Sequence, residues 1–308
     1  MLICNVMVQR VLLVGCGDVA LRVADLLRDR VRLAGVTRRR DDVRKLRQRG
    51  VVPIEGDLDD RRTLARLDLG AFAVVHCAPP PSEGKDDPRT RNLLAALSSA
   101  RIIPRRFVYL STSGVYGDCA GARVAETRPT RAHTPRARRR LAAERRLRHW
   151  AAQHRVALSI LRVPGIYAST RLPLERLKQR TPVLVADEDV FTNHIHADDL
   201  ARAIVATLYR GRPNRAYNAS DDSDMKMGAW FDAVADAFQL PRPPRVSWDD
   251  AERQIAPLLL SFMSESRRLV NARMKRELRM RLRHPTPHAM LAQTAPRELR
   301  RQLALPIG

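Results

Sequence analysis

The chain has 308 residues, of which 44% are hydrophobic, 14 are glycine and 20 are proline; this composition excludes disordered, collagen-like and low-complexity proteins and predicts a globular fold with a sizeable core. The formal net charge is +23, yet aromatic residues make up only 5% and no nucleic-acid-binding signature is present, so a nucleic-acid partner is not expected. No apolar run reaches the roughly 18 residues of a membrane helix, and no basic stretch precedes an apolar one at the N-terminus, so we expect a cytoplasmic protein without a membrane partner.

Short apolar runs alternate with helical patterns through the first half of the chain. Residues 11–14 (VLLV) form such a run, and the apolar positions of residues 21–30 recur at helical spacing. Further strands are predicted at residues 31–37, 51–58 and 71–79, within 105–118, and at 156–163, and further helices at residues 41–50, 61–67 and 137–154. Strands that alternate with helices are typical of an α/β fold, here a doubly wound parallel sheet of the Rossmann type.

The regularity weakens beyond Pro164, where prolines recur and longer loops separate short elements. We therefore expect residues 1–165 to form the dinucleotide-binding domain. Residues 166–308 should form mainly a smaller C-terminal substrate-binding lobe, with some segments returning to the sheet. The pattern at residues 228–238 places Trp230 and Phe231 on an amphipathic helix, which favours packing over ligand binding.

The segment Gly15-Cys16-Gly17-Asp18-Val19-Ala20 lies between the first strand and the first helix. In this G-x-G-x-x-A spacing Gly15 allows a tight turn, Gly17 lets the backbone approach a diphosphate, and Ala20 lets the helix pack closely on the strand. The first N–H groups of the helix also attract phosphate. We expect a dinucleotide to bind at Gly15, Gly17, Asp18 and Val19; the alternative is a purely structural glycine turn.

The end of the second predicted strand distinguishes the two pyridine coenzymes. NAD-specific sites usually place an acidic residue there for the ribose 2′-hydroxyl, whereas this chain has Arg38 and Arg39. A guanidinium group binds a 2′-phosphate through charged hydrogen bonds of about 1.5–3 kcal/mol, so NADP(H) is favoured and NAD(H) remains an alternative. A solvated arginine cluster is the competing interpretation. Asp57, after the third strand, is expected to bond the adenine amino group or, alternatively, to cap the following helix.

A hydroxyl-rich strand end, Tyr109-Leu110-Ser111-Thr112-Ser113-Gly114-Val115-Tyr116-Gly117, follows the fifth predicted strand. With this segment, the glycine motif and residues 162–167, 193–200 and 217–222, the chain resembles the extended short-chain dehydrogenase/reductases, also called NAD-dependent epimerase/dehydratases. The resemblance implies a Rossmann fold, a pyridine coenzyme and a polarising hydroxyl four residues before the tyrosine of VYG, which here is Thr112. The other residues expected beside the coenzyme are Leu58, Ala78, Pro79 and Val163.

The acid/base pair of that family, Tyr-x-x-x-Lys, is absent from this chain. Its lysine lies four residues before a helix glutamate, and counting back from Glu144 gives Arg140 in the lysine place and Arg136 in the tyrosine place. Arg140 can bond the nicotinamide ribose, but a guanidinium group cannot donate a proton as a phenol does. The chain thus resembles an atypical subgroup without the tyrosine. The proton donor named beside Thr112 and Arg140 is Tyr116, with Tyr167, His133 and a water chain as alternatives.

The expected function is an NAD(P)-dependent oxidoreductase or epimerase/dehydratase-like protein with a degenerate active site and a small polar or sugar-like substrate. A catalytically inactive NADP(H)-binding sensor is the alternative. Nucleic-acid binding by the eight arginines between residues 131 and 148 is a third hypothesis. A homodimer through a helix pair is a family-level expectation.

No metal site is expected. His194 and His196 precede Asp198 and Asp199, but third and fourth ligands are missing, and the aspartate pair lies where a helix N-cap belongs. The four cysteines form no C-x-x-C pair and are expected to be reduced; they are Cys4, Cys16, Cys77 and Cys119.

Overall fold

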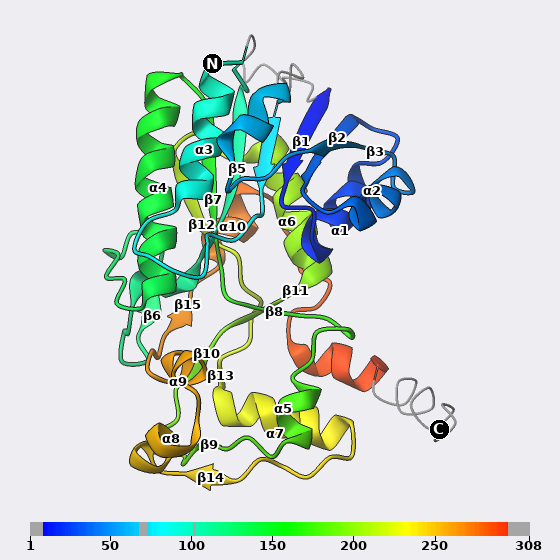
Figure 1. Ribbon diagram of the computed structural model, residues 1–308. Helices are drawn as coiled ribbons and strands as arrows, with labels where there is room; N and C mark the ends of the chain where they lie inside the picture. The colour runs from blue at the N-terminus through cyan, green and yellow to red at the C-terminus, as the bar shows by residue number, and fades with distance from the viewer. Residues whose placement is uncertain (1–8, 68–72, 101–102, 295–308) are drawn as a thin grey trace.

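A parallel sheet of seven strands forms the upper part of the computed structural model, which describes residues 9–67, 73–100 and 103–294 (Figure 1). In chain order the strands are β1 (Arg10–Val14), β2 (Arg32–Thr37), β3 (Val51–Glu55), β4 (Ala73–His76), β5 (Arg106–Thr112), β7 (Ala157–Val163) and β12 (Arg215–Asn218). Their order across the sheet is β12-β7-β5-β4-β1-β2-β3, and all neighbours are parallel. The predicted doubly wound sheet is confirmed. Of the strand predicted at residues 71–79, residues 71 and 72 lie outside the described part.

Helices cover both faces of this sheet because alternate strand residues are apolar on both sides. On one face α1 (Asp18–Leu27) and α6 (Ala197–Arg210) share a core with Val11 and Leu13. On the other face α3 (Pro88–Ser98) and α4 (Pro135–Gln153), which lie side by side in Figure 1, share a core with Leu12 and Val14. The shorter helices of this part are α2 (Arg40–Arg47), α10 (Ala272–Glu277) and the 3-10 helices η1 (Arg61–Arg66) and η2 (Ser113–Tyr116). The helix predicted at residues 61–67 is therefore a 3-10 helix.

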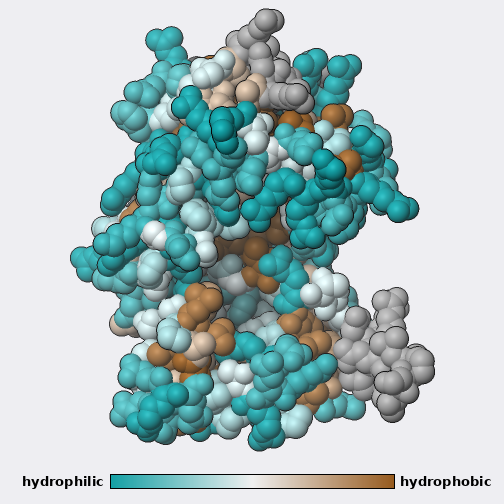
Figure 2. Space-filling model, viewed as in Figure 1, coloured by the Kyte–Doolittle hydropathy of each residue, from teal (hydrophilic) through white to brown (hydrophobic). Residues whose placement is uncertain are grey.

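The lower part of the molecule is a lobe of short elements, separated from the upper part by a hollow that Figure 2 shows. Its paired strands are β9 (Val183–Leu184) with β14 (Arg245–Val246) and β10 (Phe191–Thr192) with β13 (Met225–Lys226). Two further pairs lie between the two parts: β8 (Gly165–Tyr167) with β11 (His194–His196) packs on the core beside α6, and β6 (Arg123–Val124) with β15 (Arg268–Leu269) packs beside η2. The helices of the lobe are α5 (Leu174–Lys178), α7 (Met227–Ala237), α8 (Trp248–Gln254) and α9 (Pro257–Met263). Trp230 and Phe231 are buried in the core of this lobe, which confirms their predicted packing role.

Segments beyond residue 165 return to the sheet. Helix α6 covers one face, and β12 forms the edge strand beside β7, with Tyr217 opposite Leu161. The division of the chain into domains at residue 165 stays a prediction. Within the described ranges, no helix is both long enough and apolar enough to cross a membrane.

A buried ion pair fixes α4 against the sheet. Glu144 of α4 accepts hydrogen bonds from Ser111 Oγ of β5 at 2.6 Å and from Arg162 Nη2 of β7 at 2.8 Å. The Glu144 and Arg162 side chains are only 2% and 6% exposed. Charged groups buried this deeply need an oppositely charged group in direct contact, because an unpaired buried charge is strongly destabilising. The pair therefore sets the position of the helix that carries Arg136 and Arg140.

Candidate coenzyme and active site

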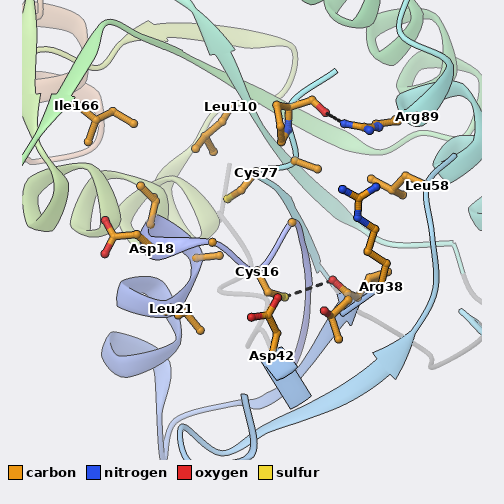
Figure 3. Close-up of a pocket in the computed structure, with 18 of the residues that line it drawn as sticks. Cys16, Asp18, Leu21, Arg38, Asp42, Leu58, Cys77, Arg89, Leu110 and Ile166 are labelled. Carbon is orange, nitrogen blue, oxygen red and sulfur yellow. Dashed lines mark hydrogen bonds between the residues drawn. The ribbon is translucent and has the colours of Figure 1, made fainter. Parts of the chain in front are cut away.

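A cavity of about 920 Å³ opens beyond the carboxyl ends of β1, β2, β4 and β5, where the strand order reverses. Every residue predicted to contact the coenzyme lines it, and so does Thr112; the set is Gly15, Gly17, Asp18, Val19, Arg38, Arg39, Asp57, Leu58, Ala78, Pro79, Thr112, Arg140 and Val163. Figure 3 shows Arg38, Leu58 and Arg89 on one side of the cavity and Asp18 and Ile166 on the opposite side. The structure brings these residues together, and their roles in binding stay predictions.

The glycine turn leaves bare backbone at the wall of the cavity. Gly15 has a φ of +86°, and a Cβ built on it would lie only 2.4 Å from the backbone nitrogen of Ala78. Gly17 is the N-cap of α1 without a side-chain cap, and a Cβ there would meet nothing within 4 Å. The first turn of α1 thus has free N–H groups beside open space, an arrangement that fits a diphosphate.

Positive side chains gather at the ends of β2 and β3. Arg38 and Arg39 are 61% and 66% exposed, and they form only long ion pairs: Asp59 is 3.7 Å from Arg38, and Asp41 and Asp42 are each 3.9 Å from Arg39. Lys45 of α2 and Arg89 of α3 also line the cavity, although sequence reasoning missed both. The sequence around Lys45 and Arg89 contains no motif that indicates that these helix residues face the end of a strand distant in the chain.

Asp57 lies at the same end of the cavity and does not cap the following helix. Its carboxylate accepts a hydrogen bond from the Asp59 nitrogen at 2.9 Å. The N-cap of η1 is Asp60, which accepts from the Arg62 nitrogen at 3.1 Å. Asp57 thus caps the turn at residues 58–59 that directly follows it, and not helix η1, which begins three residues later than a cap at Asp57 requires.

The inner end of the cavity holds Thr112 and Arg140. Thr112 Oγ1 accepts a hydrogen bond from the Gly114 nitrogen at 3.2 Å. Arg140 Nη1 donates to Leu110 O at 2.8 Å, to Tyr109 Oη at 3.2 Å and to Ala78 O at 3.3 Å. Burial, aided by the charge of Arg140, lowers the pKa of His76 to about 3, so this neighbouring imidazole is neutral. The arginine therefore holds a positive charge among uncharged groups.

A family model for the NAD dependent epimerase/dehydratase family matches residues 19–220. The chain belongs to this family. Human dTDP-D-glucose 4,6-dehydratase is 25% identical over 146 residues, which are 45% of this chain and 41% of that enzyme. The chain thus spans about two fifths of the length of the curated relatives it matches.

Solved structures share the fold over nearly the whole chain. A functionally unknown conserved protein from Silicibacter pomeroyi DSS has a TM-score of 0.76 and 27% identity, over 94% of this chain and 99% of its own. The UDP-glucuronic acid 4-epimerase from Bacillus cereus, solved in complex with NAD, has a TM-score of 0.73 and 16% identity, over 96% of this chain and 100% of its own. The likeness to the epimerase shows the fold alone.

The side chains proposed as proton donors lie outside the cavity. Tyr116 is 1% exposed, and its hydroxyl donates to Asn218 Oδ1 at 2.7 Å, so the structure does not bring it to Thr112. Tyr167 is buried in the lobe core, and His133 is exposed. Neither lines the cavity. Arg136, which we predicted to stand in the tyrosine place, donates to Ser261 Oγ at 2.6 Å and lies over the ring of Phe262.

The histidine and aspartate motif has a different arrangement from the one predicted. His196, not the aspartate pair, caps α6: its Nδ1 accepts from the Asp198 nitrogen at 3.2 Å. His284 lies beside them, so that one ligand atom each of His196, Asp198 and His284 fall within 4.8 Å of one another. The expectation that a third potential ligand was missing is therefore wrong. Asp198 is paired with Arg22.

The eight arginines between residues 131 and 148 do not form one outward basic face. Those that contact other parts of the chain are Arg136, Arg139, Arg140, Arg146 and Arg148. Arg139, for example, donates to Gly84 O at 2.8 Å, and Arg146 pairs with Asp86 at 2.9 Å. Because binding to a phosphate backbone needs free guanidinium groups, these contacts disfavour the nucleic-acid hypothesis.

Cys16, Cys77 and Cys119 are free thiols, as predicted, and Cys4 lies outside the described residues.

Proposed function

We propose that the chain is an NADP(H)-dependent oxidoreductase or epimerase/dehydratase-like enzyme that acts on a small polar or sugar-like substrate with a non-standard acid/base group. One observation carries this proposal: a single cavity joins the bare glycine turn, the largely exposed Arg38 and Arg39, and Thr112 together with Arg140. The family of the chain supports it, as do fold relatives solved with NAD.

Each end of the cavity has a task in this proposal. The backbone of Gly15 and Gly17 and the start of α1 bind the diphosphate, while Arg38 and Arg39 clasp the 2′-phosphate. Asp57 and Leu58 hold the adenine. When bound, the nicotinamide ring supplies or accepts a hydride.

At the inner end, Arg140 bonds the nicotinamide ribose, and Thr112 orients the oxygen of the substrate. The three oxygen acceptors around Arg140 hold its guanidinium group in place for this contact. Its charge favours an oxyanion on the substrate, yet it cannot release a proton at neutral pH. The proton must therefore reach the substrate from another group.

A sensor without turnover is the second candidate. The observation that favours it is Arg136, which replaces the phenol of the family and is engaged with Ser261 and Phe262. In this case NADP(H) binding would report the redox state to a partner protein. A homodimer and a cytoplasmic location also stay predictions.

The deciding experiment is calorimetric titration of the purified chain with NADPH and NADH, before and after Arg38→Ala/Arg39→Ala. The double variant should bind NADPH at least about tenfold more weakly, since a charged hydrogen bond is worth about 1.5–3 kcal/mol, and NADH nearly as well as the wild type. Arg47→Ala, an exposed change on α2 outside the cavity, is the control. Equal losses for both coenzymes would contradict the 2′-phosphate contact. Hydride-transfer screens against aldehydes, ketones and nucleotide sugars then separate enzyme from sensor.

A further inference from the structure

Arg136 carries a partly buried positive charge that forms no ion pair within the described part of the chain. The nearby carboxylate of Glu265 acts on it through its charge but is itself paired with Arg267 at 2.9 Å. The Nη1 and Nη2 atoms of Arg136 donate to Ser261 Oγ at 2.6 Å and Ser261 O at 3.3 Å, and its guanidinium carbon lies 3.5 Å from the centre of the Phe262 ring. In the part of the chain that the structure describes, no carboxylate lies within ion-pair distance of it. Burial lowers the pKa of Arg136, so the charge is held there at a cost that an anion would offset.

Arg136 does not line the coenzyme cavity itself but lies on α4 next to the end that holds Thr112 and Arg140. It precedes Arg140 by four residues on α4, so both side chains lie on one face of the helix. Ala137, the residue next to Arg136, lies close to Gly114, since a Cβ built on Gly114 would be 3.5 Å from the Cβ of Ala137. The nitrogen of Gly114 in turn donates to Thr112 Oγ1. Arg136 is thus one turn outward from the Thr112 and Arg140 pair.

The side chains that face Arg136 come from the lobe. Ser261 and Phe262 lie on α9, and Leu258, on the same helix, is 67% exposed, while Phe262 is 47% exposed. Figure 2 shows hydrophobic side chains bordering the hollow at the height of α9. Arg136 therefore connects the N-terminal end of α4 with the apolar side chains of α9. A ligand bound between the sheet domain and the lobe would contact the guanidinium group of Arg136 and the side chains of Leu258 and Phe262.

Charge accumulates at this end of the site. The partners of Arg140 are three neutral oxygens, and those of Arg136 are two neutral oxygens and a ring. Two guanidinium groups that form no ion pair in the described part of the chain raise the local potential, although Glu265 offsets part of it, and they attract anionic ligands. A planar guanidinium fork also matches the two oxygens of a carboxylate or a phosphate.

We propose that Arg136 recognises an anionic substrate: a molecule with a carboxylate or phosphate group one helical turn outward from its reacting carbon, and an apolar edge that packs on Phe262 and Leu258. This inference rests on the proposed function, because it takes the coenzyme cavity as the place of reaction. The position that the tyrosine occupies in the family would thus have a binding role in this chain. The bonds to Ser261 hold the guanidinium group until the anion arrives.

The test compares three probes that share one sugar ring: glucuronate, glucose 6-phosphate and glucose. Each is titrated by calorimetry into the NADPH-saturated chain. The wild type should bind at least one of the two anions about tenfold or more tightly than glucose, and the preferred anion tells carboxylate from phosphate recognition. Arg136→Gln should abolish this preference, and Arg136→Lys, which keeps the charge without the fork, should retain part of it.

Two matched variants separate anion binding from a structural tether. Arg138→Gln changes an exposed arginine on the same helix and should leave the preference intact. Ser261→Ala removes the tether and keeps the guanidinium group, so the preference should persist; if it disappears together with thermal stability, Arg136 is structural. An equal affinity for the three probes in the wild type, or an unchanged ratio in Arg136→Gln, overturns the inference. If this happens while NADPH still binds, only the inference fails; if NADPH does not bind, the proposed function fails with it.

Discussion

Alanine at Gly15 and at Gly17 should separate two roles of the glycine turn. At Gly15 the new Cβ would lie 2.4 Å from the nitrogen and 2.5 Å from the Cα of Ala78, in a residue with a φ of +86°. A left-handed backbone costs a non-glycine residue about 1–2 kcal/mol, and the contact also forces the ends of β1 and β4 apart. We expect Gly15→Ala to lower the free energy of unfolding by at least about 2 kcal/mol.

At Gly17 the same change meets no atom within 4 Å, and its φ of −80° suits alanine. The cost in stability is a weaker helix cap, about 1 kcal/mol or less. The methyl group would nevertheless occupy the space through which a diphosphate approaches the backbone. The Kd for NADPH should therefore rise at least about tenfold, which corresponds to about 1.4 kcal/mol.

The assay is thermal unfolding of both variants without coenzyme, followed by calorimetric titration with NADPH. At about 2 °C per kcal/mol for a chain of this size, Tm should fall by at least about 4 °C for Gly15→Ala and by no more than about 2 °C for Gly17→Ala. Equal losses of Tm, or wild-type NADPH affinity in Gly17→Ala, would refute the reasoning.

Three other measurements test the rest of the molecule. Glu144→Ala should lower the free energy of unfolding by about 3–5 kcal/mol, because Arg162 is left buried and unpaired; a loss below about 1 kcal/mol in urea unfolding would show that the pair is dispensable. Burial raises the pKa of Asp221 to about 7, well above its unfolded value, so the native state binds the proton more tightly and stability falls as pH rises through the window between the two values. Asp221→Asn should accordingly raise Tm at pH 8 by the equivalent of about 1 kcal/mol or more and have little effect at pH 4, whereas a pH-independent difference would contradict the shift. Filter binding to duplex DNA should be lost at physiological salt, and tight binding there would revive the nucleic-acid hypothesis.

The coenzyme end of the site was predictable because each of its parts is encoded locally. Gly15 and Gly17 follow a strand and open a helix, and Arg38 follows the next strand. Parallel strands end at the same edge of a sheet, so residues with the same place in the pattern meet in space. The secondary-structure pattern therefore predicted much of this cavity.

Residues whose position depends on distant contacts could not be placed in this way. The hydroxyl of Tyr116 donates to Asn218, 102 residues further along the chain, and no local pattern indicates this contact. His284 reaches His196 only through the return of the C-terminal segment, and no local spacing relates the two. Likewise, the contact of Arg136 with α9 requires the lobe to be folded against α4.

The edge strand β12 joins the sheet only after the chain has passed through the first lobe elements and through α6. Until residue 218 of 308 has been synthesised, β7 exposes an unpaired row of backbone N–H and C=O groups. A fragment that ends at residue 165 should consequently aggregate instead of serving as a free-standing nucleotide-binding module. During translation, too, the six-stranded nascent sheet remains open to mispairing at β7 until β12 has been synthesised.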